Sequence, residues 1–113
     1  MEYWHNPRCT KSRQALALLR EKGVAPTVRE YLKTPPSAAE LKDVVTALQL
    51  SSARELMRTK EDAYTQLGLK DVDDEDQLIQ AMADNPKLIE RPILIHDGKA
   101  AIGRPTEQIL EAL

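Results

Sequence analysis

The first third of the chain combines one helical hydrophobic pattern with two short apolar stretches. From Thr10 to Lys22 the apolar side chains recur at the spacing of a helix face, and Gly23 is a natural end for that helix. Residues 2–6 and 26–32, on either side of it, each predict a short strand. The start of the chain therefore predicts a β-α-β unit.

The middle of the chain predicts helices only. Ser37 and Glu40 have the spacing of a capping box, and the apolar positions that follow predict the clearest helix in the chain. Ser52 and Glu55 repeat this spacing and predict a shorter helix that runs through Arg58. Two further helical stretches, each closed by a helix-breaking residue, are predicted over residues 62–67 and around residues 78–82.

Strands return near the C-terminus. Residues 92–96 are mostly apolar, Asp97-Gly98 is a strong two-residue hairpin signal, and residues 99–102 return as the partner strand. A final helix is predicted after Thr106. A β-α-β unit joined to a β-β-α unit is the arrangement of a thioredoxin-like α/β fold with a mixed four-stranded sheet. We therefore expect a single domain over residues 1–113, with an all-helical insertion at about residues 37–85.

Composition limits the classes of partner. The 113 residues are 42% hydrophobic and 30% charged, with a net charge of −2, which is typical of a globular protein with no overall field for nucleic acid or membrane. The sequence has no apolar run that could span a bilayer and no signal-peptide pattern. A single cysteine cannot form an internal disulfide, so we expect a reducing, cytoplasmic location. We also expect a monomer.

Cys9 is the strongest chemical candidate. It is the only cysteine, and Arg8, Lys11 and Arg13 lie within four positions of it. Lone cysteines are often inert and buried, but this one is predicted at a helix start, where the pKa of a thiol falls. We expect a reactive thiolate with a pKa below about 8.5, the ordinary value. The Cys-x-x-Ser pattern with Ser12 lacks a second thiol, so a redox cycle at Cys9 needs an external one, such as glutathione.

Other side chains are candidates for the same site. Arg91 and Arg104 each directly precede a proline, and the two Arg-Pro pairs bracket the hairpin. Pro92 is a candidate for a cis peptide bond, which would place Arg91 near the thiol. His5, four residues before Cys9, could tune the thiol or simply cap the first strand. Arg8 and Arg13 could act at the thiol or be solvated.

The remaining arginines and the second histidine have weaker claims. Arg20, Arg29 and Arg54 are interpreted as ordinary surface residues, and His96 as a solvated residue at the hairpin end. The two histidines and one cysteine do not form the pattern of a zinc site.

Taken together, these segments resemble the glutaredoxin-dependent arsenate reductases of the ArsC type, within the ArsC/Spx group. The resemblance covers essentially the whole chain. The segments that carry it are residues 5–13 (HNPRCTKSR), 31–36 (YLKTPP), 54–58 (RELMR), 85–92 (NPKLIERP) and 103–105 (GRP).

The resemblance implies roles for individual residues. Cys9 would be the nucleophile, and Arg58, Arg91 and Arg104 would hold an arsenic oxyanion. Planar guanidinium groups match such an anion and offset its repulsion by a thiolate. His5 and Ser12 match family positions near the thiol.

The resemblance also implies the reaction and its partners. Glutathione would be the co-substrate and glutaredoxin the protein that regenerates the thiol, and neither a metal nor a nucleotide is needed. The implied activity is the reduction of arsenate to arsenite in arsenic detoxification.

Two other functions stay open at this point. The same fold and thiol would suit a glutathione-linked thiol-disulfide oxidoreductase with another substrate. The Spx regulators, which bind RNA polymerase, resemble this fold as well, but they usually carry Cys-x-x-Cys, and Ser12 breaks that pattern here.

Overall fold

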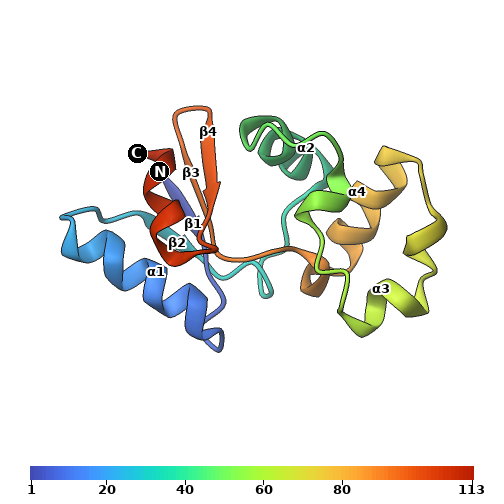
Figure 1. Cartoon of the computed structure of the whole chain (residues 1–113), viewed down its shortest axis with the longest axis horizontal. Helices are drawn as coiled ribbons and strands as arrows, with labels where there is room; N and C mark the ends of the chain where they lie inside the picture. The colour runs from blue at the N-terminus through green and yellow to red at the C-terminus, as the bar shows by residue number, and fades with distance from the viewer. The chain divides into compact units, whose positions relative to one another are not determined.

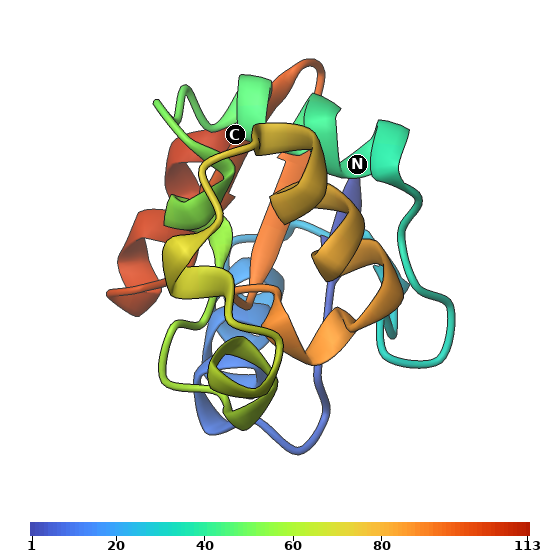
Figure 2. The same ribbon diagram turned by 90° about the vertical axis from the view of Figure 1, so that its right-hand side faces the viewer.

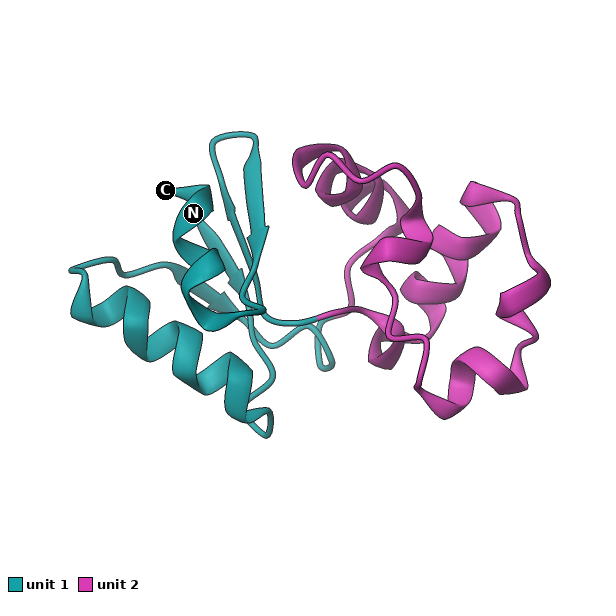
Figure 3. Ribbon diagram, viewed as in Figure 1, with its two compact units in different colours: residues 1–34, 91–113 teal, residues 35–90 magenta.

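The chain forms two compact units in the computed structural model, which describes residues 1–113. One unit combines residues 1–34 with residues 91–113, and the other is formed by residues 35–90 (Figure 3). The second unit contains helices and no strand, so it is the predicted insertion and extends a few residues beyond the predicted ends. The count of one domain stays a prediction.

The first unit, called the sheet unit below, contains a mixed sheet of four short strands. They are β1 (Glu2–Trp4), β2 (Thr27–Arg29), β3 (Ile93–His96) and β4 (Lys99–Ile102). The strand order is β2-β1-β3-β4, with β1 parallel to β2 and antiparallel to β3, and β4 antiparallel to β3. This is the predicted thioredoxin-like α/β arrangement of β-α-β and β-β-α parts.

The second strand is shorter than predicted. It was expected over residues 26–32, but β2 ends at Arg29. The chain turns immediately afterwards, because the N–H groups of Lys33 and Thr34 donate to the carbonyl of Glu30, at 2.9 and 3.1 Å. Local turn bonds therefore replace the ladder beyond Arg29.

Two helices cover one face of the sheet. Helix α1 (Thr10–Glu21) and the 3-10 helix η4 (Thr106–Ala112) lie on the same side in Figure 1. They share one apolar core with the strands, formed by Tyr3, Ala15, Leu16, Leu19, Leu94, Ala101, Ile109 and Ala112. Every member is at most 6% exposed. This core fixes α1 against β1, and so fixes the helix start at which Cys9 lies.

The hairpin between β3 and β4 follows the sequence signal. Asp97 and Gly98 have φ values of 48° and 77°, the left-handed conformation that a type I′ two-residue hairpin connection requires at both positions. We had expected His96 to be solvated, but its ring nitrogens have partners in the fold. Its Nδ1 lies 3.2 Å from the carbonyl oxygen of Ala112, and its Nε2 lies 3.2 Å from Asp97 Oδ2. The hairpin is thereby linked to the C-terminal helix.

The second unit, called the helical unit, is a chain of short helices (Figure 2). They are α2 (Ala38–Ala47), η1 (Ala53–Leu56), α3 (Asp62–Gln66), η2 (Leu69–Asp71), α4 (Glu75–Asp84) and η3 (Pro86–Leu88). Both predicted capping boxes are present, at Ser37 with Glu40 and at Ser52 with Glu55. These local signals therefore place the starts of α2 and η1 correctly.

The predicted extent of the helix after Ser52 was wrong. That helix was expected to run through Arg58, but η1 ends at Leu56 and Met57 is extended. The reason is pairing with a segment distant in sequence. The Arg58 N–H donates to Leu88 O at 2.7 Å, and the Glu90 N–H donates to Leu56 O at 2.8 Å.

Arg54 is a structural residue rather than an ordinary surface residue. Its guanidinium donates to Leu69 O at 2.9 Å, and also to the hydroxyl of Tyr64 and to Val72 O. The same group lies over the Tyr64 ring, 5.9 Å from the centroid. One side chain therefore connects η1, α3 and the two ends of η2.

We expect Arg54→Ala to lower the free energy of unfolding by about 2–3 kcal/mol, because several partly buried hydrogen bonds of a charged donor are lost together. Urea unfolding measures this change. Lys60→Ala, which removes an exposed cation of the same unit, is the control and should change the free energy by less than about 0.5 kcal/mol. Equal losses in the two variants would contradict the assignment.

Candidate active site at the start of helix α1

Cys9 occupies the N-cap position of α1. Its backbone is extended, with φ −92° and ψ 121°, and its carbonyl accepts the Arg13 N–H at 3.1 Å. The Cys9 N–H in turn donates to Asn6 O at 3.0 Å, and the residue is partly exposed. The predicted position of the thiol at a helix start is therefore correct.

Ser12 holds the loop before Cys9 in place. It is fully buried, and its Oγ accepts the Asn6 N–H at 3.0 Å. The same oxygen lies 2.7 Å from His5 Nδ1. The hydroxyl of Tyr3 donates to the carbonyl oxygen of Ser12 at 2.6 Å. The first turn of α1 is thus bonded to β1 and to both residues that follow it.

The surroundings of His5 favour its neutral form. It is only 9% exposed, and burial is the largest cause that lowers its pKa from the ordinary value. The carboxylate of Glu30 raises this pKa, whereas the charges of Arg20 and Arg13 lower it further. The direction of the hydrogen bond between His5 Nδ1 and Ser12 Oγ depends on the ring tautomer. When Ser12 donates it, the ring proton of neutral His5 is on Nε2.

The two Arg-Pro segments meet at Cys9. Arg104 donates from Nε to Arg91 O at 2.8 Å, and its Nη2 lies 3.8 Å from Cys9 Sγ. The Arg91-Pro92 peptide bond is cis, which confirms the expectation at Pro92, and the Arg104-Pro105 bond is cis as well. Arg91 and Arg104, which follow Cys9 by 82 and 95 positions in the sequence, therefore supply positive charge near its sulfur.

Gly103 allows the two segments to approach. Its N–H donates to Pro92 O at 3.0 Å. A Cβ at this position would lie 2.8 Å from Pro92 Cγ and 3.2 Å from Ala15 Cβ, closer than the rigid proline ring tolerates. Glycine thus lets β4 lead directly into Arg104 beside the start of α1.

The net effect of these groups favours the thiolate. Partial burial of the Cys9 thiol raises its pKa. The N–H groups of Ser12 and Lys11 and the charges of Arg91 and Arg104 act in the opposite direction, and together they hold the pKa of Cys9 below its ordinary value. The neutral thiol makes no capping hydrogen bond, whereas a thiolate is a stronger acceptor for these N–H groups.

We expect the alkylation rate of Cys9 by iodoacetamide to rise with pH at a midpoint below about 8.5, the ordinary pKa of a cysteine. Arg104→Gln should move this midpoint upward, because a cation beside the sulfur is lost. Lys99→Gln removes an exposed cation of the same unit and should leave the midpoint unchanged. A wild-type midpoint at or above the ordinary value would contradict an activated thiolate.

The other candidate residues lie in different surroundings. Arg13 donates to Pro7 O at 2.8 Å and to Thr10 Oγ1 at 3.2 Å, so it braces the loop that carries Cys9. Arg8 is exposed, and its N–H donates to Asn6 Oδ1 at 3.0 Å. Whether either also acts on a substrate stays a prediction.

Arg58 belongs to the helical unit. Its Nη1 lies 3.1 Å from Glu61 Oε2 and 3.5 Å from Lys87 O. The side chain is about 30% exposed. Its role in oxyanion binding stays a prediction.

Sequence reasoning missed two residues of this site. Tyr3 was seen only as part of a short apolar strand, and its hydroxyl bond to Ser12 spans nine positions. Gly103 directly precedes the second Arg-Pro pair, and this neighbourhood was the only sequence feature that could have indicated a role for it. Both act through contacts with residues distant in sequence, which no local sequence pattern predicts.

Two further properties complete the description. No group of three or more His, Cys, Asp or Glu side chains is arranged to hold a metal ion. None of the helices is long and apolar enough to cross a membrane.

Comparison with known proteins identifies the family of this chain. The model of the ArsC family matches residues 4–112. An uncharacterized protein of Escherichia coli K12, YfgD, is 58% identical over 98% of this chain and 94% of its own length. An arsenate reductase of Neisseria meningitidis is 54% identical over 96% of this chain and 94% of its own length.

Solved structures agree as well. An arsenate reductase from Vibrio cholerae is 50% identical, superposes with a TM-score of 0.96, and is matched over 100% of this chain and 98% of its own. The match includes the Cys9 loop and both Arg-Pro segments, since nearly every residue is covered. This chain belongs to the ArsC family.

Proposed function

We propose that this protein reduces arsenate to arsenite, with Cys9 as the nucleophile and with glutathione and glutaredoxin as the reductants. Relatives that are more than half identical over nearly the whole chain are named arsenate reductases, which supports the proposal. The observation that carries it is the position of Arg104, whose Nη2 lies 3.8 Å from the Cys9 sulfur beside Arg91.

The arginines offset the repulsion between a thiolate and an anionic substrate. Arsenate is an anion, and a thiolate that approaches it is repelled. Two guanidinium groups at the sulfur offset that repulsion and donate to tetrahedral oxygens in a geometry that lysine cannot match. The same charges lower the pKa of Cys9, which favours the ionised form of the nucleophile.

The proposed reaction has three steps, and atoms and electrons are conserved in each. The Cys9 thiolate attacks arsenic, an S–As bond forms, and an arsenate oxygen leaves as water after protonation. A glutathione thiolate then attacks the Cys9 sulfur, so that a disulfide forms and the S–As electron pair stays on arsenic, which leaves as arsenite. A glutaredoxin thiolate finally attacks the glutathione sulfur and releases the Cys9 thiolate.

A coupled assay tests this function. With glutathione, glutaredoxin, glutathione reductase and NADPH present, we expect NADPH oxidation to depend on both arsenate and the protein. No arsenate-dependent oxidation would reject the proposal. Exchange of Cys9 with glutathione disulfides that is unaffected by arsenate would instead support a glutathione-linked thiol-disulfide oxidoreductase.

A further inference from the structure

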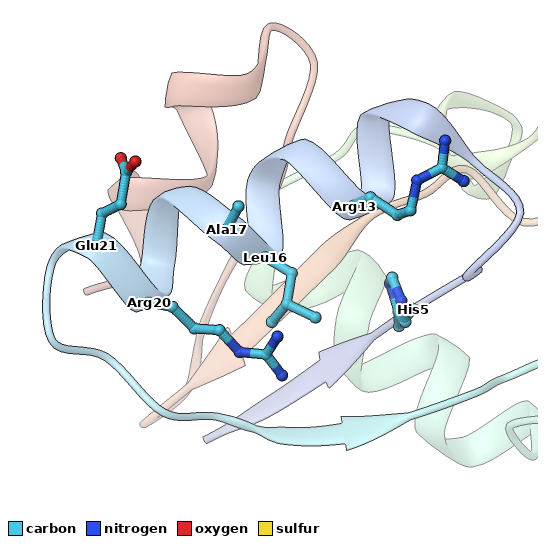
Figure 4. Close-up of a pocket in the computed structure, with 6 residues that line it drawn as sticks. All are labelled: His5, Arg13, Leu16, Ala17, Arg20 and Glu21. Carbon is cyan, nitrogen blue, oxygen red and sulfur yellow. The ribbon is translucent and has the colours of Figure 1, made fainter.

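A pocket of about 650 Å³ lies along one side of α1 in the sheet unit. Its lining consists of His5, Arg13, Leu16, Ala17, Arg20 and Glu21 (Figure 4). It contains neither Cys9 nor the two Arg-Pro segments, so the proposed reaction leaves it without a role. Its apolar floor and three nitrogen-bearing side chains are nevertheless typical of a small-ligand site.

The pocket offers hydrogen-bond donors that the fold does not use. The side chain of Arg20 is exposed and makes no hydrogen bond or ion pair, so its five N–H donors are available. In Figure 4 its side chain extends beneath Leu16 in the direction of His5. His5 is only 9% exposed, its Nδ1 faces Ser12, and its Nε2 has no partner. Such an arrangement binds an anion, and planar guanidinium favours a carboxylate.

The pocket is within reach of a thiol at Cys9. Arg13, Leu16 and Arg20 follow Cys9 at four, seven and eleven positions, which is one stripe along a helix. At 1.5 Å per residue, the middle of the pocket is about 11 Å along the axis from Cys9. In glutathione the thiol is on the middle residue, and the γ-glutamyl arm from that sulfur to its α-carboxylate spans about 10 Å when extended, because it contains eight bonds. Glutathione with its sulfur at Cys9 could therefore place its γ-glutamyl carboxylate near Leu16, within reach of the Arg20 side chain.

The charges of the pocket select one end of the tripeptide. Arg13 lies at the same end of α1 as His5, whereas Arg20 and Glu21 lie toward the other end, and the Arg20 side chain extends from there toward His5 (Figure 4). Glu21 disfavours a ligand that has only negative charge. The γ-glutamyl end of glutathione carries an ammonium group beside its carboxylate, whereas the glycine end carries a carboxylate alone.

We propose that this pocket binds the γ-glutamyl carboxylate of the glutathione co-substrate through Arg20 and His5 Nε2, with the charge of Arg13 nearby. This inference rests on the proposed use of glutathione, and it assigns the binding site of that co-substrate. The contact also reaches the thiol loop, since His5 is 2.7 Å from Ser12, whose Oγ accepts from Asn6.

Occupation of the pocket is linked to the protonation of His5. The groups that face this ring are Arg20 and Arg13 from α1, Glu30 from the turn after β2, and the neutral side chains of Tyr3 and Ser12. A bound carboxylate partly cancels the two arginine charges, so the pKa of His5 rises on binding. By linkage, the ligand then binds more tightly as the pH falls through that pKa.

The test is a titration of the intact wild-type protein with S-methylglutathione, which cannot react, followed by NMR of the His5 ring and the α1 amides. We expect saturable shifts at His5, Arg13 and Arg20, and a higher His5 pKa at saturation. Arg20→Gln should weaken binding about tenfold. Lys22→Gln, which removes an exposed cation of the same helical segment outside the pocket, should bind as wild type does.

Esters separate the two ends of the ligand. S-methylglutathione esterified only at glycine should still bind, and the diester should bind at least about tenfold more weakly. Equal binding by Arg20→Gln and wild type, shifts confined to residues outside the pocket, or equal binding of acetate would overturn the proposal. These outcomes do not depend on arsenate, so normal arsenate turnover with failed binding rejects only this inference. Failed turnover with the expected binding rejects only the proposed reductase function.

Discussion

Cys9→Ser is expected to lower arsenate reduction by more than about a thousandfold, because a serine hydroxyl stays protonated where the thiol ionises. The expected loss is in kcat, since no other cysteine can take over the attack on arsenic. Initial rates of arsenate-dependent NADPH oxidation measure it. The substitution changes one partly exposed atom, so the fold should be unaffected.

A control distinguishes the nucleophile from a merely nearby group. Ser12→Ala removes a buried hydroxyl that positions the loop but leaves the sulfur in place, and it should retain measurable turnover. Full turnover by Cys9→Ser would contradict the nucleophile assignment. So would an equal loss in the two variants.

Arg104→Gln and Arg91→Gln are each expected to lower kcat/KM for arsenate about tenfold to a hundredfold. A hydrogen bond between a charged donor and an anion contributes about 1.5–3 kcal/mol, and each 1.4 kcal/mol is a factor of ten. Arg104 should show the additional effect of a higher Cys9 pKa, because its Nη2 lies 3.8 Å from the sulfur. Raising the pH should therefore recover part of the Arg104→Gln defect.

Lys99→Gln provides the matched control for net charge. Lys99 is exposed on β4, in the same unit, and the substitution removes one positive charge without touching the site. Its kcat/KM should stay within about twofold of wild type, since exposed charges are screened. A loss equal to that of Arg104→Gln would mean that only the general field matters.

Local signals predicted most of the fold. The capping boxes at Ser37 and Ser52 and the Asp97-Gly98 turn depend on residues a few positions apart, and all three are present. The order of strands and helices followed from the change of hydrophobic period. Two element ends were predicted wrongly, one because of a local turn and one because of pairing with a distant segment. Turn bonds to Glu30 end β2 early, and pairing of Arg58 with Leu88 ends η1 early.

The candidate site was predictable only in part. Cys9 could be found from its neighbours, because a helix start and nearby cations are sequence-local features. The positive charges that lower the pKa of Cys9 come instead from Arg91 and Arg104, in two segments that contain cis Arg-Pro bonds and meet through the Gly103 contact. Arg20 was dismissed as an ordinary surface residue, because its place in a pocket beside buried His5 depends on how α1 packs.

The central claim is that the Cys9 sulfur takes up arsenic and then transfers the oxidation to glutathione. A single-turnover reaction without glutaredoxin tests it most directly. Released arsenite is quantified, and the mass of the intact protein is measured by mass spectrometry at short reaction times. The account predicts one arsenite released and one glutathione bound at Cys9 per protein molecule, and neither when arsenate is omitted. Arsenite release without glutathione on Cys9, or equal glutathionylation without arsenate, would contradict it.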